Sequence, residues 1–473
     1  MVKSAIQPSN LADFSSEYRF NPLALRLGPL LTEVLAQVKQ DQERQGTKLV
    51  SGLVVWLVLA LTIRRDLSCS AVLNWMISGW RWLSCLLPKA VVAEGTITHA
   101  RKRVGSAVFK LLFERVVDTF NPLGADFHGW VSVAFDGSTG TMPDTAANQS
   151  RFSKTKSRRE ASAYPQMRWV SLLAIGPRLL LDVAYGPSKG KGTGERTLMM
   201  SILQRLKAKN LLFMVDAGLY SFPMMWAIEQ QDCAFLLKVS SNPVLPVTQR
   251  LPDGSYLCHK QGKILDPLHS TEKRKKWQSK TITLRVITYQ IPGFRPARLV
   301  TNLLDPTLSA PELVMQYHKR WDIELCLDEI KTHQCATLRG QMPTLFRSKL
   351  PELVEQELYA MMIVYNLLRE LMLQAATPVQ KDPQLLGFLD CLQLVIDAVP
   401  HMSQPLPCQE LAHQHQYLLS LIAQAELDRP RRARVNERVV KVRMSKFKRK
   451  TSQHRSSSRD VKKDLQIIPP EAA

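Results

Sequence analysis

In the central third of the chain, short apolar segments are repeatedly followed at once by a carboxylate or a turn. This pattern restricts the possible folds more than any other feature of the sequence. Val131–Phe135 is followed at once by Asp136-Gly137, and Leu211–Val215 is followed at once by Asp216. Short apolar runs bounded by Gly, Pro or Asp predict buried β-strands. Gly194–Lys209, before the second of these strands, has apolar residues at helical spacing. Strands that alternate with helices predict an α/β domain.

Further strand patterns lie on both sides of this helix. Arg168–Ile175 and Arg178–Ala184 predict two strands joined by a Gly-Pro turn, and Cys233–Val239 predicts a third. From residue 240 to about 300 the chain is rich in Pro and Lys and contains short strand-like pieces such as Thr281–Tyr289. We therefore expect a β-rich insertion that interrupts the α/β domain.

The chain on either side of the α/β domain is predicted to be helical. Pro311–His333 and Pro351–Gln374 are clear helical patterns after the insertion. Near the N-terminus, Thr96 is expected to cap a helix whose first turns carry Arg101 and Arg103, and such a basic helix can enter a DNA groove. The alternative is a solvated face. Helical spacing in the first 125 residues is found in Leu25–Val38, Val50–Ile63, Ala71–Leu87 and Val104–Val117.

The charge balance indicates a polyanionic partner. The 473 residues include 63 Lys and Arg against 41 Asp and Glu, a net charge of +22, and the segment from Arg429 onward holds 15 basic and 4 acidic residues. This excess favours nucleic acid over an acidic membrane face. The most apolar run, Val50–Ile63, is too short to span a membrane. The eight cysteines form no C-x-x-C pair, which is typical of thiols in a reducing compartment. We expect a cytoplasmic, nucleoid-associated protein.

Four polar side chains share one face of the first helix after the insertion. They are Tyr317, Arg320, Glu324 and Lys331. Their spacings of 3, 4 and 7 residues align them along one stripe of an α-helix. A solvated face with an Arg320–Glu324 ion pair is the simplest interpretation. The aromatic side chains of Tyr317 and Trp321 favour a functional interpretation, because they are awkward on a purely solvated face.

Three carboxylates can meet at the edge of the predicted sheet. Asp136 and Asp216 each follow a strand, and the carboxyl ends of strands face the crevice where α/β folds bind ligands. Glu324 would join them from the helix. Three such groups can hold two Mg²⁺ ions about 4 Å apart, with Mn²⁺ as a substitute, whereas the lack of a Cys/His cluster disfavours zinc. Asp328, one turn beyond Glu324, and Asp144 are alternative ligands.

At these spacings Tyr317, Arg320, Glu324 and Lys331 resemble the Y-R-E-K signature of DDE transposases from bacterial insertion sequences, of the element-4 type. The resemblance covers roughly residues 15 to 375. The block after the second predicted aspartate has Ala217 where the family more often has Arg, which leaves the aspartate in place. Further segments that resemble the family are Ala100–Gly105, Phe135–Ser138, Met142–Thr145, Ala163–Arg168, Val215–Ser221, Lys238–Pro243 and Leu251–Ser255.

The resemblance implies a transposase that binds the terminal inverted repeats of an insertion sequence and catalyses DNA cleavage and strand transfer with two metal ions. It implies an RNase H-like core in which Asp136, Asp216 and Glu324 are catalytic metal ligands. Double-stranded DNA, as element ends and target, and a homodimer on DNA are the implied partners. The candidate DNA-binding residues are Tyr317, Arg320 and Lys331 at terminal phosphates, Trp321 as a stacking residue with core packing as the alternative, and Arg101 and Arg103 on the basic helix.

Two other functions stay open on this sequence. One is an RNase H-fold, metal-dependent nuclease that cuts DNA without joining it, and the other is a catalytically inactive, transposase-derived DNA-binding protein. The predicted order of parts is residues 1–125, a helical N-terminal DNA-binding domain; 126–239, the first part of the RNase H-like core; 240–300, the β-rich insertion; 301–375, the rest of the core with the glutamate helix; 376–428, a helical C-terminal region and candidate for dimerisation; and 429–473, a basic flexible tail.

Overall fold

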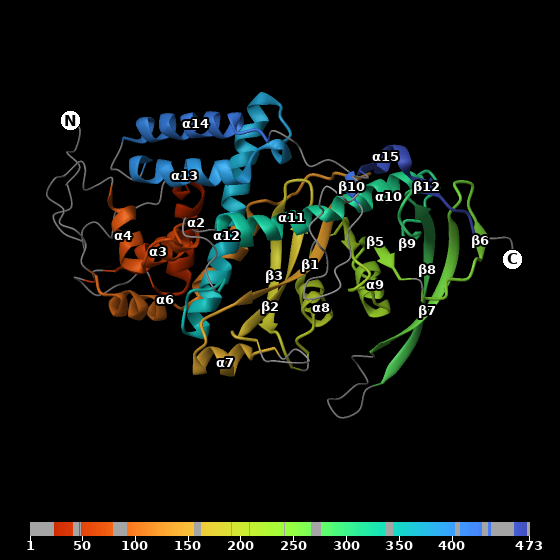
Figure 1. The fold of residues 1–473 in the computed structure, drawn as a ribbon, viewed down its shortest axis with the longest axis horizontal. Coiled ribbons are helices and arrows are strands. Elements are labelled where there is room, and N and C mark those ends of the chain that lie inside the picture. Colours follow the sequence, from red (N-terminus) through yellow and green to blue (C-terminus); the bar gives the residue numbers. More distant parts are fainter. Residues whose placement is uncertain are drawn as a thin grey trace, which may run out of the picture.

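The computed structural model arranges the chain as an N-terminal group of helices, a central β-sheet, and the strands of the insertion at the end opposite the helices (Figure 1). Helix α12 lies between the N-terminal helices and the sheet, and α13 and α14 lie along the upper side of the helical part in this view. The described residues are 23–40, 47, 49–78, 92–155, 162–190, 192–207, 209–240, 242–265, 276–335, 344–402, 407–427, 434–436 and 458–470.

The N-terminal helices follow from the apolar spacing of the sequence. Helix α3 has almost no polar side chains, and 12 of its 13 residues are buried. Gly105, with φ of 74°, divides α6 into two helical pieces. The predicted cap at Thr96 is wrong, because α6 begins at Glu94, whose negative charge suits the first turn of a helix. The bounds are α2 (Ala24–Gln37), α3 (Ser51–Ile63), α4 (Cys69–Met76) and α6 (Glu94–Asp118).

The central sheet has the strand order β3-β2-β1-β4-β5. β1, β2 and β3 form an antiparallel meander, whereas β4 and β5 run parallel to β1. This topology confirms the expected α/β, RNase H-like core. The bounds are β1 (Val131–Thr141), β2 (Gln166–Ala174), β3 (Leu179–Pro187), β4 (Leu211–Val215) and β5 (Ala234–Val239), with the helices α7 (Ala146–Phe152), α8 (Glu195–Arg205) and α9 (Phe222–Glu229) between them.

Strand β1 is longer than predicted. The apolar pattern ends at Phe135, but β1 continues to Thr141 because this whole stretch pairs with β2. The parallel pairing of β1 with β4 ends at Ala134. Asp136 therefore lies within a strand rather than in a turn, at the point where β1 separates from β4. Strand β4, in contrast, ends at Val215 as predicted.

The insertion continues the core sheet instead of forming a separate one. β9 pairs antiparallel with β5, and β8, β7 and β6 follow in order. Together with β12 (Gln466–Ile467), which pairs with β8, they give a sheet of ten strands in the described part of the chain. Its bounds are β6 (Gln249–Arg250), β7 (Tyr256–Leu265), β8 (Trp277–Gln290) and β9 (Ala297–Thr301).

The segment after the insertion is helical, but it is not one α-helix. A capping box between Ser309 and Glu312 starts it. A 3-10 turn and a π-helical turn then interrupt the α-helical geometry predicted for Pro311–His333. The bounds are α10 (Ala310–His318), η1 (Lys319–Trp321), α11 (Asp322–Asp328), the π turn η2 (Glu329–Gln334), and the long buried helix α12 (Pro351–Ala376).

The C-terminal region contains two amphipathic helices and a short segment that returns to the sheet. Residues 458–470 pack on the insertion: Ile467 pairs with Tyr289 of β8, and Val461 is fully buried. The prediction of a flexible tail over residues 429–473 is therefore wrong for this last segment, which carries apolar residues that the sheet buries. The bounds are η3 (Thr377–Val379), η4 (Pro383–Leu385), α13 (Phe388–Met402), α14 (Cys408–Gln424), β10 (Arg434–Asn436), β11 (Ser458–Asp460), α15 (Val461–Asp464) and β12 (Gln466–Ile467).

None of the helices in the described part of the chain combines the length and the apolar character needed to cross a membrane. Cys69, Cys233, Cys258, Cys326, Cys335 and Cys391 are free thiols.

Candidate active site

Asp136 lies half-buried on β1. Its Oδ1 accepts a hydrogen bond of 2.8 Å from the backbone N–H of Gly137. Burial raises the pKa of this carboxyl from 3.8 to about 6; the Gly137 N–H and the charge of Arg320 oppose the increase, whereas the negative charges of Glu324 and Glu195 add to it. These side chains therefore lie close enough to Asp136 to act on it electrostatically.

Asp216 follows β4 directly and is exposed. Residues 217–219 form a turn after it, and the N–H of Leu219 donates to the Asp216 carbonyl at 3.0 Å. Burial alone would lower the pKa of Arg320, but Tyr317, Glu324 and Asp216 raise it, so this guanidinium stays charged. Asp216 thus faces the same helical segment as Asp136.

The helical segment contacts the strands that carry both aspartates. The Tyr317 hydroxyl, which is buried, donates to the carbonyl of Val215 at 3.4 Å, at the end of β4. The Lys331 Nζ donates to the Ser138 Oγ at 3.1 Å, two residues after Asp136 on β1. These contacts hold the segment across the edge of the sheet at which the parallel strands β1 and β4 separate.

Glu324 lies between these two contacts and is paired with Arg320. The Arg320 Nη2 donates to the Glu324 Oε1 at 2.9 Å. The Arg320 side chain is 9% exposed and that of Glu324 is 34% exposed, so the pair is not the solvated ion pair of the simplest interpretation. Arg320 also lies 6.0 Å from the centre of the Tyr317 ring. The face of the segment that carries Tyr317, Arg320 and Glu324 therefore points toward the sheet.

The other predicted DNA-binding residues differ in exposure. Trp321, next to Arg320, is 44% exposed, which leaves its ring accessible for stacking. Arg101 is 5% exposed and donates to the carbonyl of Leu353 at 3.1 Å and to Gln356 on α12. This burial contradicts the role predicted for Arg101, because only one side of the basic helix faces solvent. Arg103 donates to the carbonyl of Leu49 within the helical part.

The two alternative acidic ligands are engaged elsewhere. Asp144 accepts hydrogen bonds from Lys154 at 2.6 Å and Gln149 at 2.7 Å. Asp328 accepts a hydrogen bond from Thr332 at 2.8 Å on its own helical turn. Neither acidic residue is among the charges that shift the pKa of Asp136.

The three candidate carboxylates suit a hard divalent cation, although they do not lie close together in the structure. Within the described ranges, no three or more His, Cys, Asp or Glu side chains are grouped closely enough to hold a metal ion. The candidate ligands are nevertheless all carboxylate oxygens, which Mg²⁺ and Mn²⁺ prefer. A half-buried carboxyl whose pKa is raised by burial and by two acidic neighbours is an environment that a cation would stabilise.

The sequence interpretation missed two residues at the start of α8. The side chain of Glu195 lies against Gly137, and Arg196 donates two hydrogen bonds, of 3.0 and 3.2 Å, to the carbonyl of Gly218 after Asp216. The available signal was weak: a Gly-Glu pair at a predicted helix start is also what an ordinary helix N-terminus looks like.

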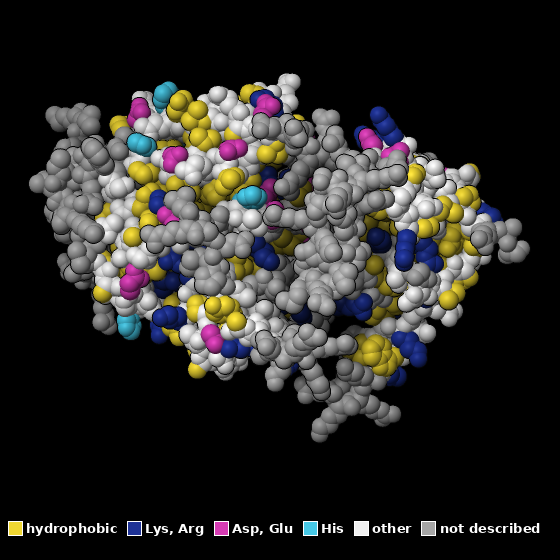
Figure 2. Space-filling model, in the orientation of Figure 1, with side chains coloured by type: hydrophobic (Ala, Val, Ile, Leu, Met, Phe, Trp, Pro, Cys, Tyr) yellow, Lys and Arg dark blue, Asp and Glu magenta, His cyan; other side chains and the backbone are white. Residues whose placement is uncertain are grey.

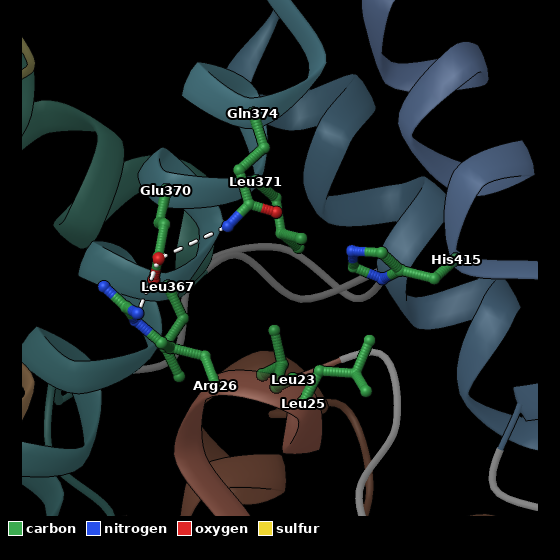
Figure 3. A pocket seen from close by; sticks show the side chains of 8 residues that line it. All are labelled: Leu23, Leu25, Arg26, Leu367, Glu370, Leu371, Gln374 and His415. Atoms are coloured by element: carbon green, nitrogen blue, oxygen red, sulfur yellow. Dashed lines mark hydrogen bonds and ion pairs between the residues drawn. The ribbon is translucent and has the colours of Figure 1, made fainter. Parts of the chain in front are cut away.

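A cavity lies away from the candidate active site. It measures about 220 Å³ and lies between α2, α12 and α14 (Figure 3). Arg26 and Glu370 form an ion pair of 3.0 Å at its wall. None of its lining residues belongs to the elements that carry the three carboxylates, so it is not the candidate active site. The lining residues are Leu23, Leu25, Arg26, Leu367, Glu370, Leu371, Gln374 and His415.

The two kinds of charge are unevenly spread over the face in Figure 2. Acidic side chains lie mainly over the helical part, whereas Lys and Arg side chains lie over the sheet and the insertion as well as over the helical part. With a net charge of +22, this distribution suits a polyanion that lies across the sheet.

Two family models match the chain. The model described as "Insertion element 4 transposase N-terminal" matches residues 27–114, and the model described as "Transposase DDE domain" matches residues 132–367. The second match contains the three carboxylates and the helical segment with Tyr317 and Lys331.

The chain is also similar to individual transposases. The chain is 26% identical over 333 residues to the transposase InsG of insertion sequence element IS4 from Escherichia coli, covering 68% of this chain and 70% of that protein. It is 29% identical over 147 residues to the putative transposase InsZ of the same species, covering 30% of this chain and 48% of that protein. A cryo-EM structure of a piggyBac transposase synaptic complex with hairpin DNA is 10% identical, with a TM-score of 0.41, and covers 84% of this chain and 83% of that chain. A likeness at that TM-score supports no conclusion.

Proposed function

The chain belongs to the insertion-element DDE transposases, which bind DNA, cleave it and transfer its strands, and we propose that Asp136, Asp216 and Glu324 are its catalytic metal ligands. The observation that carries this proposal is the bridging of the two strands by one helical segment. Tyr317 contacts the residue before Asp216, and Lys331 contacts a residue two positions after Asp136. Glu324 lies between those two contacts.

A divalent metal ion is required by enzymes with this domain, and we propose two Mg²⁺ ions per site, with Mn²⁺ as a substitute. Bound between these carboxylates, the ions would lower the barrier for attack on phosphorus by stabilising charge on the entering and leaving oxygens. The carboxylates of Asp136 and Asp216 would hold the ions from the sheet. Glu324 would complete the set from the helix, exchanging its ion pair with Arg320 for the metal.

DNA contacts are proposed for the basic and aromatic residues around these carboxylates. Arg320 presents a planar fork of donors that matches phosphate oxygens, and the Lys331 ammonium acts as a point charge. Tyr317, which was predicted at a terminal phosphate, is buried with its hydroxyl against β4 and its ring beside Arg320, so we propose that it supports Arg320 instead of binding DNA. Trp321 is sufficiently exposed to stack on a base. Arg103 is kept as the candidate from the N-terminal helices, which we propose bind the terminal inverted repeats.

A homodimer on DNA is also proposed, through α13 and α14. Its support is the exposure of Leu389 and Tyr417, which are 50% and 62% accessible on these two helices. Exposed large apolar side chains on adjacent elements suit a protein interface.

The test of the site is the separation of cleavage from binding. Asp136→Asn, Asp216→Asn and Glu324→Gln should each abolish Mg²⁺-dependent cleavage of an element-end duplex and leave its binding within about threefold, because no phosphate contact is removed. Electrophoretic mobility shifts measure binding and denaturing gels measure nicking. A variant that still cleaves at the wild-type rate would remove that residue from the site.

Strand transfer distinguishes a transposase from a nuclease of the same fold. Precleaved element ends, incubated with plasmid and Mg²⁺, should become joined to the plasmid. Nicking without joining would support the nuclease, and DNA binding without either reaction would support an inactive descendant.

A further inference from the structure

Glu195 occupies the space next to Asp136 that Gly137 leaves open. A Cβ atom on Gly137 would lie 2.7 Å from the Glu195 Cδ and 2.9 Å from its Oε1, far inside ordinary contact distance. The backbone of Gly137 does not require glycine, because residue 137 is a regular strand residue without a positive φ. The absence of a side chain at Gly137 therefore lets the Glu195 carboxylate approach the strand that carries Asp136.

The start of α8 also contacts the loop that carries Asp216. Arg196, the neighbour of Glu195, grips the Gly218 carbonyl with two hydrogen bonds. One helix end thus reaches both aspartate-bearing segments. Because Arg196 fixes this end, the position of Glu195 beside β1 is coupled to that of the Asp216 loop.

A purely structural role for Glu195 has limited support. Its ion pair with Arg168 has an N–O distance of 3.8 Å, too long for a hydrogen bond, and the Arg168 Nε is buried without a hydrogen-bond partner. Among the described residues, no hydrogen-bond donor reaches the Glu195 carboxylate. A carboxylate in the first turn favours a helix, but that does not explain why β1 makes room for it.

We propose that Glu195 is a fourth acidic residue of the catalytic centre and holds the divalent ion from the side of β1, together with Asp136. This inference rests on the proposed function, since it adds a ligand to the same site. Its side chain is 44% exposed, so its oxygens are open to a cation and its water. The metal site would then have carboxylate oxygens from β1, from the β4 end, from the helical segment and from α8.

The test measures metal binding without DNA or catalysis. Mn²⁺ is titrated into the full-length protein, and the electron paramagnetic resonance signal of free Mn²⁺ gives the Kd. Glu195→Gln keeps the size of the side chain and removes its charge, and it should weaken Mn²⁺ binding roughly tenfold or more. Gly137→Ala keeps every charge but displaces Glu195, and it should weaken binding in the same direction.

Arg168→Gln is the matched control, because it removes the ion-pair partner and leaves the carboxylate. If Glu195 holds the ion, Arg168→Gln should leave Mn²⁺ affinity unchanged or tighter, since a nearby positive charge is lost. If Glu195 only pairs with Arg168, both substitutions should lower the Tm alike and neither should move the Kd, and the inference is then overturned. Glu195→Asp, which retains the charge, should recover part of the affinity.

Asp136→Asn separates this inference from the proposed function. If Asp136→Asn loses Mn²⁺ binding but Glu195→Gln does not, only the inference fails. If neither Asp136→Asn nor Glu324→Gln affects Mn²⁺ binding, the proposed site itself is wrong.

Discussion

A buried ionic network anchors the short helix α11, which carries Glu324. Glu329, the first residue of the π turn, accepts hydrogen bonds from Arg369 and, at 3.2 Å, from the Tyr365 hydroxyl, both on α12. Arg178, at the start of β3, lies 3.8 Å from Glu329 and donates to Asp322 at 3.0 Å. The network therefore fixes the first residue of α11 and the residue that follows the helix, and Glu324 is held between them.

Replacing Glu329 by Gln should be strongly destabilising. The Arg369 side chain is 3% exposed and that of Glu329 is 15% exposed, so solvent cannot replace the lost carboxylate. Removing one partner of a buried ion pair costs about 3–5 kcal/mol. In a domain of this size that corresponds to a decrease in Tm on the order of 10 °C. Cleavage should fall as well, even at temperatures where the variant is folded, because Glu324 loses its fixed position.

Urea unfolding and thermal unfolding of the metal-free protein measure the effect. Asp328→Asn is the matched control: this neighbouring carboxylate is 46% exposed and bonds only within its own turn, so its loss should cost less than about 1 kcal/mol. Adding Arg369→Met to Glu329→Gln should restore much of the stability, since no unpaired buried charge is left. Equal losses in Glu329→Gln and Asp328→Asn, or no rescue, would refute the network as the anchor of α11.

Three further predictions concern the site and its DNA. The pKa of Asp136 is raised by burial from 3.8 to about 6, so its protonated form stabilises the fold, and this contribution is lost as pH rises through about 6; metal-free Asp136→Asn should therefore melt above wild type at pH 8 but not at pH 4, and equal melting points at pH 8 would contradict the shift. Arg320→Ala should slow cleavage and weaken end binding, with partial rescue by Arg320→Lys, and its Mg²⁺ midpoint should stay the same or fall because Glu324 is released from its ion pair; a higher midpoint with intact end binding would mean that Arg320 holds Glu324 in place for the metal. Replacing the 11 basic residues between Arg429 and Lys450 by Ser should weaken binding to any DNA and flatten its salt dependence by roughly 0.9 in slope for each lost contact; an unchanged slope would exclude phosphate contacts there.

The strands of the core could be predicted because the residue types at their ends mark where they stop. Leu211–Val215 is a wholly apolar run that stops at a charged residue, and the structure ends β4 there. β1 shows the limit of this approach. Gly137 and the polar residues after it carry no strand signal of their own, and they extend β1 only because β2 pairs with them. Pairing partners lie outside any local window of sequence.

The misplaced Arg101 and the missed Glu195 have related causes. A run of basic residues on a helix looks solvated, but α12 covers one side of α6 and takes Arg101 into its contact surface. Glu195 looks like an ordinary helix-start residue until Gly137, nearly sixty positions earlier, is seen to face it. Both roles depend on a neighbour distant in sequence, so neither could be obtained from spacing within one segment.

Tyr317, Glu324 and Lys331 lie along the sheet edge although the segment that carries them is not one α-helix, and the reason is geometric. The spacing was interpreted as a stripe on a straight α-helix, whereas the segment contains a 3-10 turn before α11 and a π turn after it. A 3-10 turn rotates the chain more per residue than an α-helix and a π turn rotates it less, so their deviations from the α-helical rotation have opposite sign and partly cancel. Lys331, inside the π turn, consequently still reaches Ser138 on β1. The π turn begins at Glu329, the residue bound by Arg369, so the network that anchors α11 also holds the start of the turn that carries Lys331.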